Sequence, residues 1–527
     1  MGWNSYNYYS CSPSESIMKS NALGLVALGM DKLGYKYVTT DCGWNADYRD
    51  ASTGQLVWNP SAFPSGGKSL GDYIHGLGLK FGVYSGGGYY QCGSTNEPAS
   101  LNHETLDANS FASWGADSLK YDNCYSVSNT TMVDYTSPGA TSPTRYQTMA
   151  SAIAAVSRDM VFQICQWGVG TDIGTWASQI ADSWRISNDI QDNWASIWRI
   201  TNEVAPYYKH TTVGAYPDMD MLIVGLKVLS LEEEQFHFGM WAINKSPLIA
   251  GCPMNTSLTP SESLAILANT EVIALNQDPL GEQAQLVRRY SEEQWDIWVG
   301  NLSGSRMVVG LANWKNSANS VSVDLAKVLG ISSATARDVW AATGLGSISG
   351  TYSATLAGHQ LKLVVLSNTV KASSSATLKS TGVYYAATNA TLSGAAVKTA
   401  CGAGQCLPVG SKVSYIGQGA AAAAVTLGDV KTTTGGTKVL GVDFINYDVA
   451  LASAWSGGTN TRNMTISVNG GTPKYWAFPI SGGDWFETGR LQVEVAGFKA
   501  GSANTVAFGA YTDGTYAPDL VGFEVFE

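Results

Sequence analysis

Two aspartates far apart in the chain each follow a short β-prone run of residues. Asp122 ends the run Ser118–Asp122, and Asp189 lies just beyond the run Ser183–Ser187. In a parallel α/β barrel the carboxyl ends of the strands surround the open mouth, so both carboxylates would face one cavity. Two carboxylates across a cavity can cleave a glycosidic bond, one attacking the anomeric carbon while the other protonates the leaving oxygen.

Basic residues on the same two runs would set the charge of this pair. Lys120 lies two residues before Asp122, and the alternation of a strand points both side chains to one face. We expect Lys120 to keep Asp122 ionised and a less solvated position to keep Asp189 protonated. Arg185 lies four residues before Asp189. A buried ion pair between Lys120 and Asp122 that only stabilises the barrel is the alternative, and the second carboxylate argues against it.

The elements that must position these residues alternate between β-prone runs and amphipathic helical patterns up to about residue 285. The expected strands are Met1–Tyr6, Tyr37–Asp41, Lys80–Tyr84, Ser118–Asp122, Val161–Gln166, Ser183–Ser187, Thr211–Val213 and Pro247–Ala250. The expected helices include Ser14–Leu28, His103–Trp114, Arg145–Val156, Glu232–Ile243 and one capped by Thr259 with Pro260 as its first residue. Eight strand and helix pairs predict an α/β fold of the (β/α)8 TIM barrel type. An open doubly wound sheet is the alternative, but its glycine-rich phosphate turn is missing.

Beyond residue 285 the pattern changes to short alternating strands separated by turn residues. We expect the barrel over residues 1–285, an antiparallel β-sandwich over 286–368, a Ser/Ala/Thr/Lys-rich linker over 369–380 and a second all-β antiparallel sandwich over 381–527. Cys401 and Cys406 are close enough to form a disulfide across one loop of the last domain. The alanine-rich tract Gly419–Val425 is interpreted as a packed strand.

Composition excludes several classes of function. The net charge of −11 leaves nothing to neutralise phosphates, which argues against nucleic-acid binding. No apolar run reaches the ~18 residues of a membrane span, and 17 Trp with 26 Tyr are typical of proteins that stack sugars on aromatic rings. Eight cysteines without a CxxC pair favour a secreted, extracellular protein with disulfides. Six Asn-X-Ser/Thr sequons agree, at Asn129, Asn244 (weakened by Pro247), Asn255, Asn301, Asn389 and Asn463.

Five sequence blocks together resemble the signature of glycoside hydrolase family 27, the α-galactosidase family, in its fungal type. They are Met1–Ser5, Tyr37–Asp41, Lys120–Cys124, Arg185 with Asp189, and Asp218–Leu222. The resemblance covers residues 1–368. It implies a retaining hydrolase of terminal α-D-galactosyl residues that uses no cofactor, with Asp122 as the nucleophile and Asp189 as the acid/base.

The same resemblance implies a pocket for one terminal sugar ring. Its residues would be Trp3, Tyr6, Asp41, Tyr84, Lys120, Gln166, Arg185 and Asp220. It also implies two disulfides, Cys11–Cys42 and Cys92–Cys124, the second at the rim of the pocket. The expected partners are galactose- or arabinopyranose-terminated oligosaccharides and polysaccharides.

Three departures from the family pattern bear on which sugar the pocket takes. Thr40 stands where the family has the first of two adjacent aspartates, Gln166 replaces a glutamate, and Tyr6 replaces a tryptophan. A β-L-arabinopyranose is a galactose without its hydroxymethyl group, so a pocket with a weaker O6 contact favours a β-L-arabinopyranosidase as the alternative activity. A non-catalytic galactose-binding protein is the second alternative, but it would need no nucleophile.

Asp218, Cys165, Cys252 and one glycine tract have structural interpretations, whereas Asp220 is expected to bind sugar hydroxyls. Asp218 and Asp220 share one face of an extended segment, but only His210 lies near them in sequence, so no metal is expected. Cys165 and Cys252 have no obvious partner and are interpreted as buried thiols or one pair. Gly86–Gly88 lacks the Lys-Ser/Thr of a phosphate loop, and we expect a flexible barrel loop over the sugar.

The C-terminal domain resembles family 35 carbohydrate-binding modules at both of its ends, Gly382–Gly394 and Pro518–Val525. The calcium-binding glutamate of that family is replaced around Ala387–Thr388, which argues against calcium there. The aromatic residues that could stack on a sugar are Trp455, Trp476, Trp485 and Tyr511. Packing inside the sandwich is the alternative for at least half of them.

Overall fold

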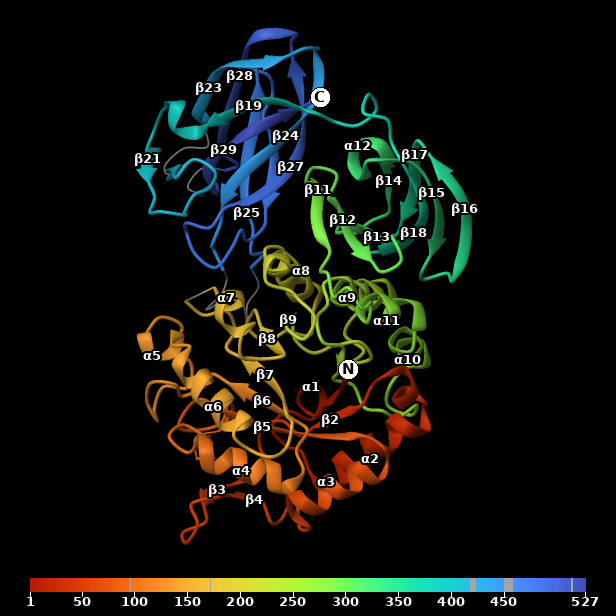
Figure 1. Cartoon of the computed structure of the whole chain (residues 1–527), viewed down its shortest axis with the longest axis vertical. Helices are drawn as coiled ribbons and strands as arrows, with labels where there is room; N and C mark the ends of the chain where they lie inside the picture. Colours follow the sequence, from red (N-terminus) through yellow and green to blue (C-terminus); the bar gives the residue numbers. More distant parts are fainter. Residues whose placement is uncertain (95, 171, 418–422, 450–457, 513–514) are drawn as a thin grey trace. The chain divides into compact units, whose positions relative to one another are not determined.

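The computed structural model describes residues 1–94, 96–170, 172–417, 423–449, 458–512 and 515–527 (Figure 1). The chain divides into two compact units. The first contains Met1–Ile197 and Lys209–Gly281, and the second contains Trp198–Tyr208, Glu282–Ala450 and Gly458–Glu527. Among the described residues, no helix combines the length and the apolar character needed to cross a membrane.

Eight parallel strands form a single sheet in the first unit, in the spatial order β10-β1-β2-β5-β6-β7-β8-β9. Their bounds are β1 Gly2–Asn4, β2 Tyr37–Thr39, β5 Lys80–Gly86, β6 Ser118–Asp122, β7 Val161–Cys165, β8 Ser183–Arg185, β9 Tyr216–Asp218 and β10 Ile249–Ala250. A parallel bridge between Leu222 and Ala250 joins the segment after β9 to β10. The sheet therefore closes, and the predicted (β/α)8 barrel is confirmed.

The seventh barrel strand is not where the sequence pattern places it. The β-branched run Thr211–Val213 belongs to a turn, in which Thr212 pairs with Ala215 in an antiparallel bridge and Gly214 has φ +86°. The strand itself is β9, whose central residue Pro217 pairs with Trp184 of β8. A proline within a run normally argues against a strand, which explains the misplacement.

The helices lie between the strands at the expected places (Figure 1). They are α1 Tyr6–Tyr9, α2 Glu15–Ala27, α3 Gly66–Gly76, α4 Glu104–Trp114, α5 Pro138–Thr141, α6 Thr144–Ala154, α7 Ile173–Ala177, α8 Trp194–Val204, α9 Leu231–Ile243, α10 Ser261–Leu267 and α11 Thr270–Asn276. Ser14 caps α2, and Ser230 with Glu233 forms a capping box on α9. Helix α10 starts one residue later than expected, with Pro260 as its N-cap. An additional hairpin, β3 Asn45–Arg49 with β4 Leu56–Trp58, follows β2.

The register of β5 and β6 brings the glycine tract against the strand that ends in Asp122. Gly86 is paired with Asp122, and the N–H of Gly87 donates to the carbonyl oxygen of Asp122 at 2.9 Å. A Cβ atom on Gly88 would lie 1.9 Å from the carbonyl oxygen of Cys124. The expectation of a flexible loop is therefore wrong, since Gly86–Gly88 is closely packed and glycine is required by the approach of two backbones.

The second unit contains two antiparallel β-sandwiches, as expected. The first sandwich has a sheet in the order β11-β12-β13-β18-β15-β16 and a separate pair, β14-β17. The second has two sheets, in the orders β21-β22-β29-β24-β27 and β20-β23-β28-β25-β26, and β19 pairs with β29. The strands of the first run from β11 Gln285–Tyr290 through β12 Trp295–Leu302, β13 Arg306–Asn313, β14 Asn319–Asp324, β15 Ile331–Asp338, β16 Thr343–Ser349 and β17 Thr351–Leu356 to β18 Leu361–Lys371, with the short helix α12 Leu325–Leu329. Each sandwich has its own cluster of buried apolar side chains.

The C-terminal sandwich begins nearly where the sequence places it. Its strands are β19 Ser380–Ala386, β20 Thr391–Leu392, β21 Val397–Ala400, β22 Ser411–Ser414, β23 Ala423–Thr432, β24 Gly436–Ile445, β25 Arg462–Val468, β26 Lys474–Phe478, β27 Gly489–Phe498, β28 Gly501–Ala510 and β29 Asp519–Phe526. The connection between the sandwiches comprises residues 372–379, slightly shorter than predicted. Of the tract Gly419–Val425, residues 419–422 lie outside the described residues, as does Trp455.

Candidate active site

The charged residues singled out in the sequence lie at the carboxyl ends of the barrel strands. Asp122 is the last residue of β6, and Arg185 is the last residue of β8. Asp41 follows β2, Asp189 follows β8, and Asp220 follows β9. This is the end of a (β/α)8 barrel at which side chains from different strands share one cavity.

Both carboxylate oxygens of Asp122 are held by hydrogen bonds. Oδ2 accepts from the Tyr84 hydroxyl at 2.8 Å, and Oδ1 accepts from the backbone N–H of Asn123 at 2.9 Å. Asp122 is only 7% exposed, and this burial raises its pKa above the usual range. Lys120 and the two hydrogen bonds oppose that rise, while the charge of Asp189 adds to it. The two carboxyls therefore interact electrostatically, as a catalytic pair must.

Lys120 forms its ion pair with Asp41 and not with Asp122. The Lys120 ammonium donates to Asp41 Oδ2 at 2.7 Å, and the same oxygen accepts from the Asn4 amide at 2.8 Å. Burial is the largest single influence and opposes the charge of the ammonium, but the neighbouring groups, Asp41 first among them and Asp122 in addition, together outweigh it and hold the pKa of Lys120 above its usual range. Lys120 therefore stays cationic and acts on Asp122 through space.

Arg185 joins the other two carboxylates of the site. Its Nη2 atom is paired with Asp189 Oδ1 and lies 2.8 Å from Asp220 Oδ2. Asp220 also accepts from the N–H groups of Ile190 and Met221, each at 2.7 Å. Its φ of +82° is uncommon for a residue other than glycine, and such a conformation costs about 1–3 kcal/mol. The surrounding hydrogen bonds hold Asp220 in this strained position.

The environments of the two catalytic candidates are the reverse of the expectation. The Asp189 side chain is 32% exposed and paired with Arg185, whereas Asp122 is the more deeply buried carboxyl. The expectation that Asp189 occupies the less solvated position is therefore wrong. The reason is geometric, since Asp122 ends its strand inside the barrel while Asp189 lies four residues beyond the end of β8.

Tyr6 provides an aromatic ring and a hydroxyl on the side of the pocket formed by α1. The Lys120 ammonium lies 5.7 Å from the centre of its ring. Burial raises the pKa of Tyr6 to about 12, and the nearby carboxylates Asp189 and Asp41 contribute to this rise. The phenol therefore keeps its proton and can donate a hydrogen bond to a sugar hydroxyl.

Three residues expected to contact the sugar have no exposed surface. Trp3 donates from its indole N–H to the carbonyl oxygen of Cys252 at 2.8 Å. The Gln166 side chain donates to Val169 O at 2.7 Å and accepts from Val169 N–H at 3.0 Å. Tyr84 is likewise fully buried and donates its hydroxyl to Asp122, so the polar groups of all three side chains are engaged by the protein itself. The expectation that they touch the sugar is corrected on this point.

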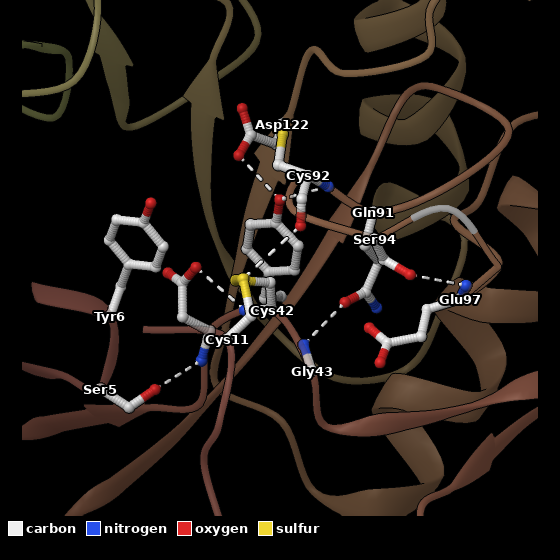
Figure 2. Close-up of a disulfide and its surroundings, with 12 residues drawn as sticks. Ser5, Tyr6, Cys11, Cys42, Gly43, Gln91, Cys92, Ser94, Glu97 and Asp122 are labelled. Atoms are coloured by element: carbon white, nitrogen blue, oxygen red, sulfur yellow. Dashed lines mark hydrogen bonds between the residues drawn. A yellow bond between two sulfur atoms is a disulfide. The ribbon is translucent and has the colours of Figure 1, made fainter. Parts of the chain in front are cut away.

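Two disulfides, Cys11–Cys42 and Cys92–Cys124, fix the loops around this cavity, and Cys401–Cys406 forms the third expected bridge. Figure 2 shows the Cys11–Cys42 bridge, whose Cys11 sulfur lies 3.6 Å from the carbonyl oxygen of Cys92. The Ser5 hydroxyl accepts from the N–H of Asp41 at 3.0 Å. The segment of Asp41 and Cys42 is thus tied to the N-terminal segment by a disulfide through Cys42 and a hydrogen bond through Asp41.

Other residues of the site lack a clear signal in the sequence. Asn4, Asn123 and Arg145 bind residues that are distant in sequence or belong to the backbone. Cys165 is a buried free thiol, as is Cys252, and its sulfur accepts from Arg185 Nη1 at 3.5 Å. Asn4 and Asn123 could have been found from their places in the first and third sequence blocks, whereas Arg145 could not. Asp218 accepts from the N–H of Asp220 at 2.8 Å and has the structural role expected for it.

Comparison with known proteins shows to which family the chain belongs. Residues 5–278 match the family model described as "Alpha galactosidase A", and residues 292–366 match the "Alpha galactosidase C-terminal beta sandwich domain". The chain belongs to the α-galactosidase family. Alpha-galactosidase D of Emericella nidulans is 35% identical over 100% of this chain and 95% of its own length. An Aspergillus fumigatus protein named "Probable alpha-galactosidase D" is 39% identical with the same coverage.

Solved structures of the α-galactosidase family share the barrel and the first sandwich. α-Galactosidase I of Mortierella vinacea is 32% identical with a TM-score of 0.65, covering 71% of this chain and 98% of its own. A GH27 β-L-arabinopyranosidase of Geobacillus stearothermophilus has a TM-score of 0.61 at 24% identity, covering 70% of this chain and 95% of its own. The second likeness shows the fold alone. Membership of the family makes the chain a glycoside hydrolase of the barrel-plus-sandwich type.

The hydrogen bond from Tyr84 to Asp122 gives a pH-dependent prediction. In Tyr84→Phe the carboxylate loses a donor worth about 1.5–3 kcal/mol for a charged acceptor. The pKa of Asp122 therefore rises further, and the carboxylate becomes ionised only at higher pH. We expect the acid limb of the kcat/KM profile for a nitrophenyl glycoside to move to higher pH by the same amount.

Tyr121→Phe is the matched control, because Tyr121 lies on β6 next to Asp122 and packs outward against Tyr146 and Phe162. Its acid limb should coincide with that of the parent. An unshifted limb in Tyr84→Phe would show that Asp122 is not the group whose ionisation limits the rate.

Proposed function

We propose that the chain is a retaining α-galactosidase that removes terminal α-D-galactosyl residues from oligosaccharides and polysaccharides. The observation that carries the proposal is the placement of Asp122 and Asp189 at the carboxyl end of one barrel, close enough for the charge of one to raise the pKa of the other. The relatives named α-galactosidase D, which match the chain over its whole length, support the choice of sugar.

The two carboxyls act in a double displacement. Asp122 attacks the anomeric carbon and forms a glycosyl ester, while Asp189 gives its proton to the oxygen of the leaving group. Asp189 then takes a proton from water, the water oxygen attacks the same carbon, and the ester bond to Asp122 breaks. Two inversions at one carbon retain its configuration. The greater exposure of Asp189 suits a group that must exchange its proton with water.

The remaining charged residues bind and orient the sugar ring. Lys120 presents a fixed cation and Asp41 a carboxylate to the hydroxyl groups, and both are held in place by their mutual ion pair. Arg185 and Asp220 do the same from the opposite strands. Because the charges neutralise each other in pairs, the empty pocket stays folded and the sugar meets groups already in place.

A β-L-arabinopyranosidase is the second candidate activity. Thr40 has no carboxylate and is fully buried. Of the two positions that carry adjacent aspartates in the family pattern, only Asp41 therefore offers a carboxylate to the sugar. A weaker contact to the hydroxymethyl group would favour a sugar that lacks it. A non-catalytic galactose-binding protein would need neither the proton donor nor the buried nucleophile.

We also propose that the C-terminal sandwich binds carbohydrate in a pocket of about 420 Å³. Aromatic side chains surround it: Tyr415, Trp485, Phe486 and Tyr516. The Arg462 guanidinium lies 4.6 Å from the ring centre of Trp485, and a buried ion pair joins Lys412 to Asp519 at 2.7 Å beneath. Flat apolar faces combined with fixed polar groups suit a sugar ring. By contrast, Trp476 is a core residue of the sandwich.

We infer that the protein acts outside the cell. Disulfides form and persist in oxidising compartments, and the structure contains three. The sequon asparagines Asn129, Asn255, Asn301 and Asn389 are exposed. Asn244 is buried and its amide donates to the Met240 carbonyl oxygen at 2.9 Å, so it is inaccessible to a glycosyltransferase.

The activity is tested with two nitrophenyl glycosides. We expect kcat/KM on the α-D-galactoside to exceed that on the β-L-arabinopyranoside, and Asp122→Asn to lower both rates by roughly three to six orders of magnitude. Asp72→Asn, at an exposed helix position, is the control and should retain full activity. A 2-fluoro galactosyl substrate should leave its sugar on Asp122, as seen by mass spectrometry. A higher rate on the arabinoside would reverse the assignment of the sugar, and a label elsewhere would overturn the mechanism.

The role of the C-terminal pocket is tested by retention on a galactomannan matrix. Tyr415 and Tyr48 are both 53% exposed, and Tyr48 belongs to the β3–β4 hairpin of the barrel unit. We expect Tyr415→Ala and Trp485→Ala to weaken retention, since an aromatic contact is worth about 0.5–1.5 kcal/mol, or roughly 2- to 12-fold in affinity. Tyr48→Ala should be retained like the parent, and all three should hydrolyse nitrophenyl galactoside normally. Equal retention of all variants would make the pocket structural.

The extracellular location is tested by peptide mapping of the protein isolated from its native host. We expect oxidised Cys11, Cys42, Cys92 and Cys124, glycans at exposed sequons, and an unmodified Asn244. Recovery of the protein inside the cell with reduced thiols would contradict the inference.

A further inference from the structure

A buried arginine on α6 contacts the catalytic loop from outside the sugar pocket. Arg145 is 9% exposed and lies in the first turn of α6. Its guanidinium donates to Gly87 O at 2.6 Å, to Asn123 Oδ1 at 2.5 Å, to Ala140 O at 3.1 Å and, through Nε, to Gly139 O at 3.0 Å. One side chain thus ties three separate segments of the chain together.

The acceptors of this arginine are all neutral. In the described part of the chain, no carboxylate lies within ion-pair distance of Arg145, whereas most buried charges are paired with an opposite charge. Leaving a buried cation without an anion costs free energy, and a neutral side chain could serve to pack α6 against the barrel. Packing alone therefore does not explain why a charged arginine occupies this buried position.

Two of the four contacts lead to Asp122 by one further hydrogen bond. The N–H of Gly87 donates to the carbonyl oxygen of Asp122 at 2.9 Å. The N–H of Asn123 donates to the carboxylate oxygen Oδ1 of Asp122 at 2.9 Å, and the Asn123 amide also donates to Gln166 O at 3.3 Å. Arg145 therefore holds two residues that bond to Asp122, one directly after β5 and one directly after β6.

We propose that Arg145 is a positioning residue for the nucleophile. By fixing Gly87 and Asn123 with the two arms of one planar fork, it sets the backbone of Asp122 and the direction in which its carboxylate points. A lysine could not make both contacts, because its single ammonium lacks the fork geometry. The proposal rests on the proposed function, since it assumes that Asp122 is the attacking group.

The test uses Arg145→Ala with chemical rescue. Because a misplacement of about 1 Å can cost about 10²-fold in rate, we expect kcat on nitrophenyl α-galactoside to fall about 100-fold, with KM changed less than about threefold. Guanidinium at tens of millimolar should fill the vacated space and restore about tenfold of the loss, while urea, which has the same shape without the charge, should restore less. A rise in KM with kcat unchanged would overturn the proposal, and so would a loss of kcat that guanidinium does not restore.

Arg158→Ala is the matched control. Arg158 follows the same helix and pairs with Asp117 at the opposite, N-terminal end of β6, far from the carboxyl group of Asp122. It should lower the melting temperature without lowering kcat. If Arg145→Ala and Arg158→Ala lower stability and kcat in the same proportion, Arg145 is only structural.

A double-mutant cycle covers the case in which Arg145→Ala does not fold. Arg145→Lys keeps the charge, and Asn123→Ala removes one of the acceptors. If Arg145 acts through Asn123, the double variant should lose about as much kcat as the more damaging single variant, because coupled residues are not additive. Fully additive losses would overturn the proposal.

The rate of labelling by the 2-fluoro galactosyl substrate separates this proposal from the proposed function. If the parent is not labelled at Asp122, the proposed function fails. If the parent is labelled at Asp122 and Arg145→Ala is labelled at the same rate, the positioning role fails while the function stands.

Discussion

Charges that are buried together must neutralise one another, and this requirement organises the mouth of the barrel. Lys120 pairs with Asp41, and Arg185 pairs with Asp220 and Asp189. The Lys120–Asp41 and Arg185–Asp220 pairs join different barrel strands, so this arrangement of charges exists only when the barrel is closed. Asp122 is left without a direct cationic partner among the ion pairs of the described residues. Its carboxylate is held by a phenol and a backbone N–H instead, and it stays available for attack on carbon.

This distribution of charge also explains how two aspartates in one cavity can differ in behaviour. Burial raises the pKa of Asp122, and Lys120, Tyr84 and Asn123 partly offset that rise. Asp189 lies nearer to water and shares Arg185 with Asp220. The distinction between the two acids therefore comes from their surroundings and from the lengths of the loops that carry them, since the side chains are chemically identical.

Much of the fold and most of the charged site could be predicted from the sequence, because strand ends and their polar residues are local patterns. The barrel, both sandwiches and the catalytic candidates belong to this class. The strand at Tyr216–Asp218 was misplaced because Pro217 contradicts local propensity, and only pairing with β8 overrides it. Local patterns likewise could not reveal that Asp189 is the more exposed acid, because exposure depends on which loops cover it.

Residues whose partners are backbone atoms of other segments left no signal at all. Arg145 is an arginine near the start of an ordinary helix, and its acceptors are three carbonyl groups and one amide from elsewhere in the chain. Trp3 lies in the first sequence block and Gln166 at a position of the family pattern, but the polar groups of both side chains are engaged by backbone contacts. Position in a motif indicated proximity to the site, and only the structure separates contact from support.

The close packing of Gly87 and Gly88 has a consequence for how this scaffold can change. A side chain at Gly88 would collide with the carbonyl oxygen of Cys124, and one at Gly87 would come within 2.8 Å of Arg145. The wall beside Asp122 is thus closed to variation, whether by natural drift or by directed evolution. New specificity must arise in the segments that carry free side chains into the mouth, above all the short helix that contains Tyr6.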